Sequence, residues 1–280
     1  MIAALLVALA ALVVATNSQN ACAFEEFQLW PALAPGEPED APKPTYELWT
    51  PDEKTSDACL VVAPGGAYDY LSYENASDLI AKYFNSKGVT AVILKYRTPR
   101  RKGLPKHMAA WQDAQRMVRV VRARAKEWEI NPDKIGFIGF SAGGHLALMV
   151  ATTSQTPAYE PIDEIDKLPC NVNFAVPIYP AYVLEDGVNG PNVNQGNDSP
   201  MVDDFAFDEK TPPMCLVHGD ADAYSPMGSV AVYAKLRKMN VPAELHIFAK
   251  VGHGFVASPP NNHYGNWLDR AYYWMQKLGY

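Results

Sequence analysis

The chain has 280 residues and a formal net charge of −7, and hydrophobic residues make up 48% of it. That content is enough to bury a full core, and α/β folds of about 250 residues often form one unit. The acidic balance argues against a nucleic-acid partner, because neutralising phosphates requires a basic face. It also disfavours binding to anionic membranes.

Residues 1–23 are predicted to be a signal peptide. Ile2 to Ala15 is an unbroken apolar run, shorter than the about 20 residues that span a membrane. Polar residues follow, and Ala21-Cys22-Ala23 then forms a small-x-small cleavage site. The mature chain is therefore expected to begin at Phe24, to be secreted or periplasmic, and to have no stable membrane association. No Lys or Arg precedes the apolar run, so an uncleaved anchor is the alternative.

Cleavage would leave three cysteines, Cys59, Cys170 and Cys215. Three cysteines cannot all pair within one chain. Cys59 and Cys215 each lie in an apolar stretch that is typical of a strand, which favours buried free thiols. The disulfide state stays open on this evidence.

Residues 24–50 are rich in Pro and Glu and are predicted to form an extended arm ahead of the main domain, residues 51–280. Within that domain strand and helix patterns alternate. Strands are expected at 58–63, 90–96, 134–140, 172–178, 214–218 and 243–248. Helices are expected at 76–86, 109–128, 143–151, 229–239 and 267–278. The alternation predicts a single α/β domain with a mostly parallel sheet and helices on both faces.

Residues 181–211 have little periodicity and many Asn, Asp, Gly and Pro residues. A segment this long without secondary structure is more often functional or mobile than structural. It is therefore expected to be an insertion or loop near a functional site.

The motif Gly139-Phe140-Ser141-Ala142-Gly143 indicates an activated serine. A serine hydroxyl is a weak nucleophile, so it needs a base and a scaffold that exposes its oxygen. In Gly-x-Ser-x-Gly the serine occupies a strained turn between a strand and a helix. The expected strand 134–140 and helix 143–151 supply that context, so Ser141 is the predicted nucleophile. His145 follows on the helix and is interpreted as structural.

The base is expected to be a histidine late in the chain, since folds with this motif run nucleophile, acid, base. His253 lies in a glycine-flanked loop just after the last expected strand, where an imidazole could reach back over the sheet. His263, in a polar Asn-rich stretch, is the alternative. His246 lies inside the strand and is interpreted as packed.

The acid must orient the imidazole and stabilise its protonated form. Asp220 and Asp222 both follow the strand 214–218, and their spacing alone leaves the choice between them open. An oxyanion hole also needs backbone N–H groups. Ala142 is expected to give one, and Gly65 or Gly66 in the turn after strand 58–63 the other, although an ordinary tight turn is the alternative.

Taken together, these residues resemble a group within the α/β-hydrolase superfamily. It comprises secreted bacterial acetylxylan-esterase and feruloyl-esterase-like enzymes, relatives of the dienelactone-hydrolase and prolyl-oligopeptidase-like branch. The resemblance covers roughly residues 58 to 278. The matching stretches are Val62 to Tyr68, Leu94 to Arg97, Asp113 to Arg116, Ile135 to Ala147, Val217 to Asp222 and Gly252 to Phe255.

The resemblance implies that Asp222, the aspartate following His-Gly-x-x, is the acid. It also implies structural roles for Tyr96-Arg97 and for Asp113 and Arg116. Two departures from the family pattern occur. Ala67 stands where a third glycine is usual, and Tyr224-Ser225-Pro226 stands where Val-Val-Pro is usual, which could change the shape of the acyl pocket.

The chain is thus expected to be a serine carboxylic-ester hydrolase that removes acetyl or aryl-acyl groups from a polysaccharide such as xylan. No cofactor or metal is expected, since no Cys/His cluster has metal-ligand spacing. Tyr68 is a candidate for contact with a sugar ring, although it could equally pack within its loop. Two alternatives stay open: a prolyl-oligopeptidase-like peptidase, and a non-catalytic carbohydrate-binding protein on a hydrolase fold.

Overall fold

A computed structural model of the chain describes residues 24–72, 76–185, 199–255, 264 and 266–280. The expected signal peptide, the stretch 186–198 of the expected insertion, and His263 lie outside these residues. Among the helices described, none combines the length and the apolar character needed to cross a membrane.

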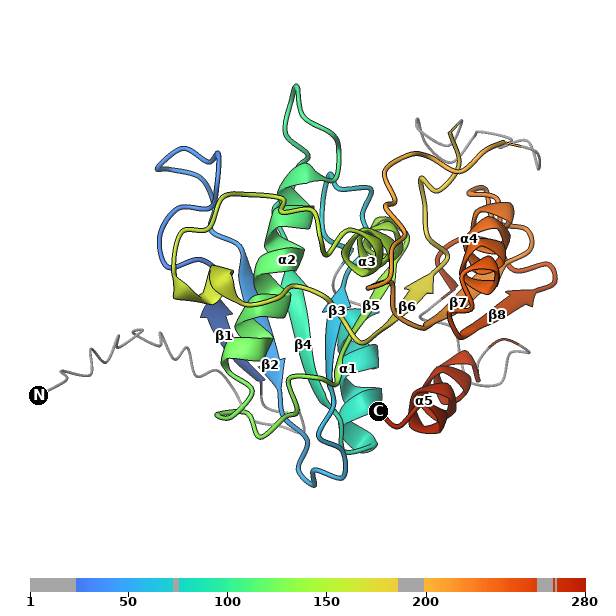
Figure 1. Cartoon of the computed structure of the whole chain (residues 1–280), viewed down its shortest axis with the longest axis horizontal. Helices are drawn as coiled ribbons and strands as arrows, with labels where there is room; N and C mark the ends of the chain where they lie inside the picture. The colour runs from blue at the N-terminus through green and yellow to red at the C-terminus, as the bar shows by residue number, and fades with distance from the viewer. Residues whose placement is uncertain (1–23, 73–75, 186–198, 256–263, 265) are drawn as a thin grey trace, which may run out of the picture.

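One eight-stranded sheet runs through the molecule in the order β1-β2-β4-β3-β5-β6-β7-β8 (Figure 1). Its strands are β1 (Phe24–Gln28), β2 (Thr45–Trp49), β3 (Cys59–Ala63), β4 (Thr90–Lys95), β5 (Ile135–Phe140), β6 (Phe174–Ile178), β7 (Met214–Gly219) and β8 (Ala243–Phe248). The pairs β1–β2 and β2–β4 are antiparallel, and all other pairs are parallel. The expectation of a mostly parallel sheet is confirmed.

Helices cover both faces of the sheet, as expected for a parallel sheet. They are α1 (Ser77–Ser86), α2 (Met108–Ala123), α3 (Ala142–Thr152), α4 (Met227–Lys238) and α5 (Trp267–Lys277). In the view of Figure 1, α2 and α3 lie in front of the strands. Side chains of α2, α3 and α4 share one apolar cluster, and those of α1 and α5 share the other.

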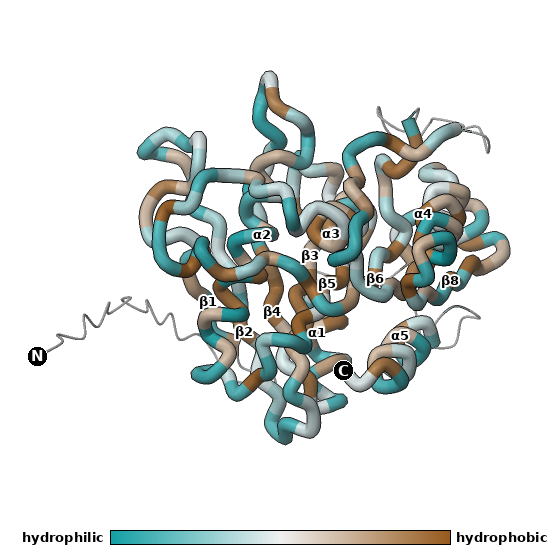
Figure 2. Tube along the Cα trace, in the orientation of Figure 1, coloured by the Kyte–Doolittle hydropathy of each residue, from teal (hydrophilic) through white to brown (hydrophobic). Residues whose placement is uncertain are grey.

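The central strands are buried on both faces, so they are apolar throughout rather than alternating with polar residues. In β3, Val61 belongs to the cluster under α2 and α3, whereas Leu60 and Val62 belong to the cluster under α1 and α5. This follows from the two-residue period of a strand. Figure 2 shows the same arrangement, with apolar colour concentrated on the central strands.

Residues 24–50 do more than form an arm, because they supply the first two strands of the sheet. β1 pairs with β2 from Phe24↔Trp49 to Gln28↔Thr45, and β2 in turn pairs with β4. The Pro and Glu content of the segment concealed both strands, since the prolines lie in the connection between them.

Buried ion pairs connect α2 to the segment after β4 and to residues 163–166. The Arg97 Nε donates to the Asp113 carboxylate at 3.0 Å, and Trp30 Nε1 donates to the same carboxylate at 2.8 Å. Arg116 donates to Asp163 at 2.6 Å and to Asp166 at 2.9 Å. These contacts agree with the structural roles that the family resemblance implied.

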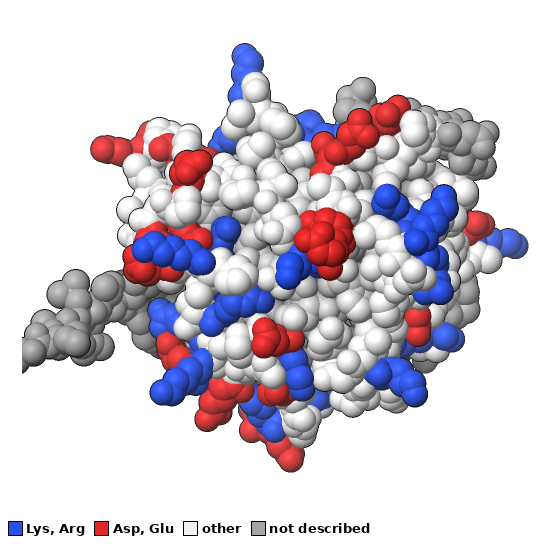
Figure 3. All heavy atoms as spheres, viewed as in Figure 1, with Lys and Arg blue, Asp and Glu red and all other residues white. Residues whose placement is uncertain are grey.

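Charged side chains of both signs are interspersed over the face drawn in Figure 3.

Candidate active site

Ser141 lies at the sharp junction between β5 and α3, with φ 55° and ψ −116°. A positive φ is strained for a non-glycine residue, and it turns the side chain out of the sheet. The flanking glycines make the turn sterically possible. A Cβ on Gly143 would lie 2.3 Å from the Ala63 carbonyl oxygen, and one on Gly139 would lie 2.0 Å from the Gly143 oxygen.

The structure brings His253 and Asp222 to this serine. The His253 Nε2 atom lies 2.7 Å from Ser141 Oγ, while Nδ1 lies 2.8 Å and 3.0 Å from the two carboxylate oxygens of Asp222. Ser141 follows β5, Asp222 follows β7 and His253 follows β8. The carboxyl ends of three parallel strands therefore deliver the three side chains to one edge of the sheet.

The Asp222 carboxylate is buried and held by several donors. Its Oδ1 accepts the backbone N–H of Tyr224 at 2.8 Å. Burial acts to raise its pKa, but hydrogen bonds from His218 and His253 outweigh burial and hold the pKa of Asp222 below its ordinary value. The group is therefore ionised at neutral pH and can accept from the imidazole Nδ1–H.

His218 is a contributor to the site that the sequence analysis did not single out. It is fully buried, and its Nε2 lies 2.9 Å from the Tyr224 carbonyl oxygen and 3.5 Å from Asp222 Oδ2. A carbonyl only accepts, so Nε2 carries the proton and Nδ1 accepts from the Ser229 hydroxyl at 2.8 Å. The signal was present in the sequence, since His218 begins the His-Gly-x-x-Asp motif.

The competing candidates lie elsewhere. Asp220 is exposed, and its backbone N–H bonds to the Phe248 carbonyl in the strand-end turn. His246 points from β8 to Glu244, at 3.1 Å. His263 lies outside the described residues. Among the described residues, the imidazole that reaches Ser141 is that of His253.

The turn predicted to complete the oxyanion hole lies directly against the serine. A Cβ on Gly65 would lie 3.3 Å from the Ser141 Cβ, and one on Gly66, whose φ is +122°, would lie 2.0 Å from the Tyr70 carbonyl oxygen. Ala142 is the first residue of α3, where a backbone N–H has no intrahelical acceptor. These amides are therefore close to the nucleophile, and their role stays a prediction.

Tyr68 does not fit the sugar-contact role considered for it, because it is fully buried. Its ring stacks on Tyr182 with centroids 6.2 Å apart, and its hydroxyl lies 2.9 Å from His145 Nδ1. Tyr70, two residues further along the same loop, is 61% exposed. The loop therefore offers solvent the ring of Tyr70 rather than that of Tyr68.

Two aromatic rings flank the imidazole of His253, and of these the sequence analysis did not name Tyr179. Tyr179 lies edge-on at a centroid distance of 4.8 Å, and Tyr224 lies at 5.0 Å. Tyr224 belongs to the segment that departs from the family pattern. These two uncharged rings enclose the imidazole of His253 on two sides.

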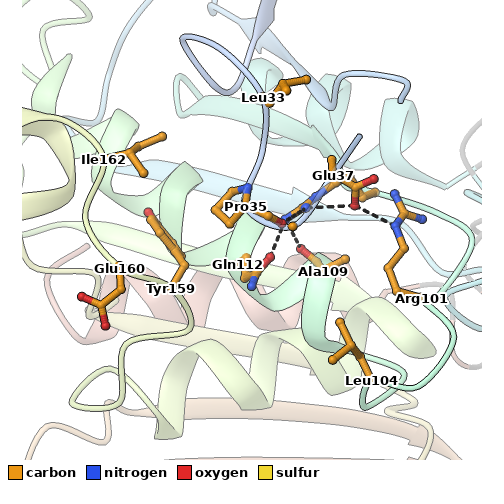
Figure 4. A pocket seen from close by; sticks show the side chains of 12 residues that line it. Leu33, Pro35, Glu37, Arg101, Leu104, Ala109, Gln112, Tyr159, Glu160 and Ile162 are labelled. Carbon is orange, nitrogen blue, oxygen red and sulfur yellow. Dashed lines mark hydrogen bonds and ion pairs between the residues drawn. The ribbon is translucent and has the colours of Figure 1, made fainter. Parts of the chain in front are cut away.

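A separate pocket of about 390 Å³ lies beside the Arg97–Asp113 pair, and no residue of the Ser141 site lines it (Figure 4). Its walls include the exposed Leu104 and the half-exposed Ile162 side chain. The Arg97 guanidinium is fully engaged there by the Pro35 and Ala109 carbonyls, Glu37 and Gln112. The N–H donors of Arg97 are therefore already occupied, and the Glu160 carboxylate also lines the pocket.

Comparison with known proteins identifies the family of the chain. The BD-FAE family profile matches residues 47–198, more than half of the chain, and the prolyl oligopeptidase family profile matches residues 176–279. The acetylxylan esterase of Xylanibacter ruminicola is 26% identical over 241 residues, which cover 81% of this chain and 45% of that protein. The chain thus spans less than half the length of this curated relative.

Two solved structures share the fold over nearly their whole length. The acetyl ester-xyloside bifunctional hydrolase of Caldicellulosiruptor lactoaceticus has a TM-score of 0.72 and 26% identity, covering 91% of this chain and 96% of its own. The propionate-bound esterase of Thermogutta terrifontis has a TM-score of 0.69 and 25% identity, covering 91% and 94%. The chain belongs to the BD-FAE family and has the α/β-hydrolase fold.

Proposed function

We propose that the chain is a serine esterase in which Ser141, His253 and Asp222 form the catalytic triad, and that it removes acetyl groups from a polysaccharide such as xylan. One observation carries the catalytic part: an unbroken hydrogen-bonded path from the Asp222 carboxylate through both ring nitrogens of His253 to Ser141 Oγ. This arrangement is the one required to activate a serine.

In the first half-reaction, Ser141 Oγ attacks the ester carbonyl carbon while His253 Nε2 takes the hydroxyl proton. The ionised Asp222 keeps the Nδ1 proton in place and stabilises the imidazolium that forms. The backbone N–H of Ala142 and that of Gly65 or Gly66 stabilise the oxyanion. His253 then returns its proton to the departing sugar alkoxide, which leaves an acyl-enzyme.

In the second half-reaction, water attacks the acyl-enzyme carbonyl and gives a proton to His253 Nε2. Collapse of the intermediate releases the carboxylic acid, and the proton returns to Ser141 Oγ. The same imidazole therefore serves as base and acid in both halves, so each cycle leaves the enzyme unchanged.

The acetylated-polysaccharide assignment has two supports. The relatives include an acetylxylan esterase and an acetyl ester-xyloside hydrolase, and a third is bound to propionate, a short carboxylate. On the chain itself, the exposed ring of Tyr70 lies in the loop that follows the Gly65-Gly66 turn. An exposed aromatic face in this loop suits stacking on a sugar ring.

An ester panel tests this proposal. Wild type and Ser141→Ala are assayed on acetylated xylan, a feruloylated oligosaccharide and a simple aryl acetate. Wild type is expected to release acetate from acetylated xylan. The alanine variant is expected to lose nearly all of its activity on each of the three substrates. Full activity in Ser141→Ala would overturn the triad, and hydrolysis of the aryl ester without any release from acetylated sugar would overturn the polysaccharide assignment.

Peptide hydrolysis is the second candidate, because the prolyl oligopeptidase profile matches residues 176–279. That span contains Asp222 and His253 but not the nucleophile. A peptidyl-prolyl chromogenic amide included in the same panel separates the two functions. Cleavage of the amide at a rate comparable to that of the ester would favour the peptidase.

We further propose that residues 1–23 direct export and are removed before Phe24. The support is the apolar run followed by the Ala21-Cys22-Ala23 site. Expression with and without residues 1–23, followed by cell fractionation and N-terminal sequencing, tests this. A full-length chain retained with intact residues 1–23 would contradict it.

A further inference from the structure

Two histidines and an aspartate converge on one point next to the Ser141 site without belonging to it. His107 directly precedes α2, His145 lies in α3, and Asp204 lies in the loop before β7. One ligand atom from each lies within 4.8 Å of the others. The Asp204 Oδ2 atom is 3.7 Å from His107 Nδ1 and 3.9 Å from His145 Nε2.

These separations are too long for hydrogen bonds, so Asp204 lies close to both imidazoles without forming a hydrogen bond to either of these nitrogens. His145 Nε2 is completely buried and has no hydrogen-bond partner among the described residues. A buried imidazole nitrogen without a partner costs free energy, so a group outside the described residues is expected to occupy this point.

The remaining ring nitrogen of His145 already has the partner that a metal ligand requires. Its Nδ1 lies 2.9 Å from the Tyr68 hydroxyl. When Nδ1–H donates to Tyr68, the lone pair of Nε2 points into the cluster. Histidines that bind metals almost always donate their other N–H in this way, which fixes the tautomer and the ring orientation.

Both imidazoles are buried, His145 completely and His107 nearly so. Asp204 is 45% exposed, so it can supply a carboxylate from the solvent side and leave an entry path for an ion.

We propose that His107, His145 and Asp204 form a site for a divalent transition metal of the zinc type. Two imidazoles and a carboxylate match the ligand preference of Zn²⁺, and water would fill the fourth tetrahedral position. Ligand bonds of about 2.1 Å place tetrahedral ligand atoms about 3.4 Å apart. The separations of 3.7 Å and 3.9 Å to Asp204 exceed this by only a few tenths of an ångström, and the two imidazole nitrogens lie within 4.8 Å of one another.

The site supports the catalytic loop rather than taking part in acyl transfer. The His145 backbone N–H bonds to the Ser141 carbonyl at 2.9 Å, and Tyr68 lies two residues after Gly66 in the chain. A metal on Nε2 would fix the His145 ring and, through Nδ1–H, the Tyr68 hydroxyl. The ion thereby holds together the helix that carries the nucleophile and the loop that carries the oxyanion amides.

The second grouping of possible ligands in the described residues, Cys215, Glu244 and His246, serves as the control. There, His246 Nε2 already bonds to Glu244 at 3.1 Å. Burial raises the pKa of the Cys215 thiol, so it stays protonated, whereas a metal binds the thiolate. Because the imidazole is already hydrogen-bonded and the thiol is protonated, this grouping is expected to bind no ion.

Metal titration of the chelator-treated protein tests the site. Wild type and His246→Ala are each expected to bind one Zn²⁺ per chain by calorimetry, and Co²⁺ is expected to give the visible absorption of a tetrahedral site. His107→Ala is expected to lose more than about 100-fold in affinity, beyond the loss that follows removal of an outer-shell partner. Binding that is absent from wild type, or that survives in His107→Ala, would overturn the proposal.

Two surface-accessible variants keep the test decisive if His107→Ala fails to fold. Asp204→Asn removes the exposed carboxylate and is expected to weaken Zn²⁺ binding at least about tenfold. Lys106 places a cation near both histidines, so Lys106→Met is expected to strengthen binding. Equal affinity in wild type and Asp204→Asn, or weaker binding in Lys106→Met, would count against the site.

Discussion

At the scale of single residues, the charge on Asp222 determines which tautomer His253 adopts. The carboxylate accepts the Nδ1 proton at 2.8 Å, which leaves the Nε2 lone pair for Ser141. Asp222→Asn could instead donate to Nδ1, so the imidazole would turn its proton toward the serine. We expect kcat to fall by about 10⁴-fold, as happens when a triad aspartate is replaced in this way.

Asp220→Asn is the matched control, because Asp220 is exposed in the same turn. It is expected to change kcat by less than twofold. Initial rates on an aryl acetate for both variants measure the difference. A larger loss in Asp220→Asn than in Asp222→Asn would reverse the assignment of the acid.

His218 is expected to act as a positioning residue behind the acid. His218→Gln would weaken the donor to the Tyr224 carbonyl and remove one cause of the low pKa of Asp222. Since one lost hydrogen bond costs about 1–2 kcal/mol, we expect a fall of about tenfold in kcat. KM should change little, so the loss should appear in kcat rather than in substrate binding. A variant with normal kcat would show that His218 only fills the core.

At the scale of elements, the Arg97–Asp113 pair joins β4, α2 and the segment after β1. Arg97 and Asp113 are both buried, and Trp30 donates to the same carboxylate. Asp113→Ala would leave the guanidinium buried without its counter-charge, so we expect a loss of about 3–5 kcal/mol in the free energy of unfolding.

Urea unfolding of Asp113→Ala measures this loss. Glu37→Gln is the comparison, because Glu37 contacts the same arginine from the pocket side at 3.1 Å without being its main partner. That substitution keeps an oxygen acceptor for Arg97, so it should cost less than Asp113→Ala. Equal losses in the two variants would show that the carboxylate of Asp113 has no special place in the network.

How much of the fold the sequence revealed depended on the burial of each element. The central strands and helices follow the predicted order, since a segment buried on both faces is apolar throughout, and β5 with α3 stood out through the serine motif. β1 and β2 escaped prediction because they lie toward an edge of the sheet and contain Glu25, Glu26 and Glu47. Glu47 is nonetheless buried, paired with Lys95 at 2.7 Å.

The site divided in a similar way. Ser141 and His253 were predicted from local patterns in the sequence. The spacing did not separate Asp222 from Asp220, so the family resemblance first indicated Asp222. The distances from Asp222 to His253 Nδ1 then gave a geometric reason for that choice. Tyr179 could not be found, since its approach to His253 depends on a turn at φ 33° after β6. The His107–His145–Asp204 grouping was equally hidden, because its members are far apart in the chain.

At the scale of the whole molecule, the buried neutral histidines link stability to pH. The folded-state pKa of His145 and of His107 lies below that of the unfolded chain. Below about pH 6.5 the unfolded state therefore binds more protons than the folded state, and stability falls as the pH falls. The expected slope is about 1.4 kcal/mol per pH unit for each histidine that stays neutral in the fold.

Urea midpoints at pH 7.5, 6.5 and 5.5, with chelator present, measure this slope. Lys106 lowers the pKa of both histidines, and Asp204 acts to raise that of His107. His145→Gln should show a shallower slope than wild type over the same range. Asp222 lies outside this window, since its lowered pKa adds stability that is lost only in stronger acid. An unchanged slope in His145→Gln would contradict the assignment.

Cys59, Cys170 and Cys215 are all buried and free, and burial raises the pKa of Cys59 to about 12. A thiol reagent therefore cannot reach them until the chain opens, so their modification rates report local opening. Cys59 and Cys215, in β3 and β7, should react only on global unfolding, and Cys170, outside the sheet, earlier. A Cys22→Ser background removes the remaining thiol. The three thiols therefore report how often the fold opens and which part of it opens.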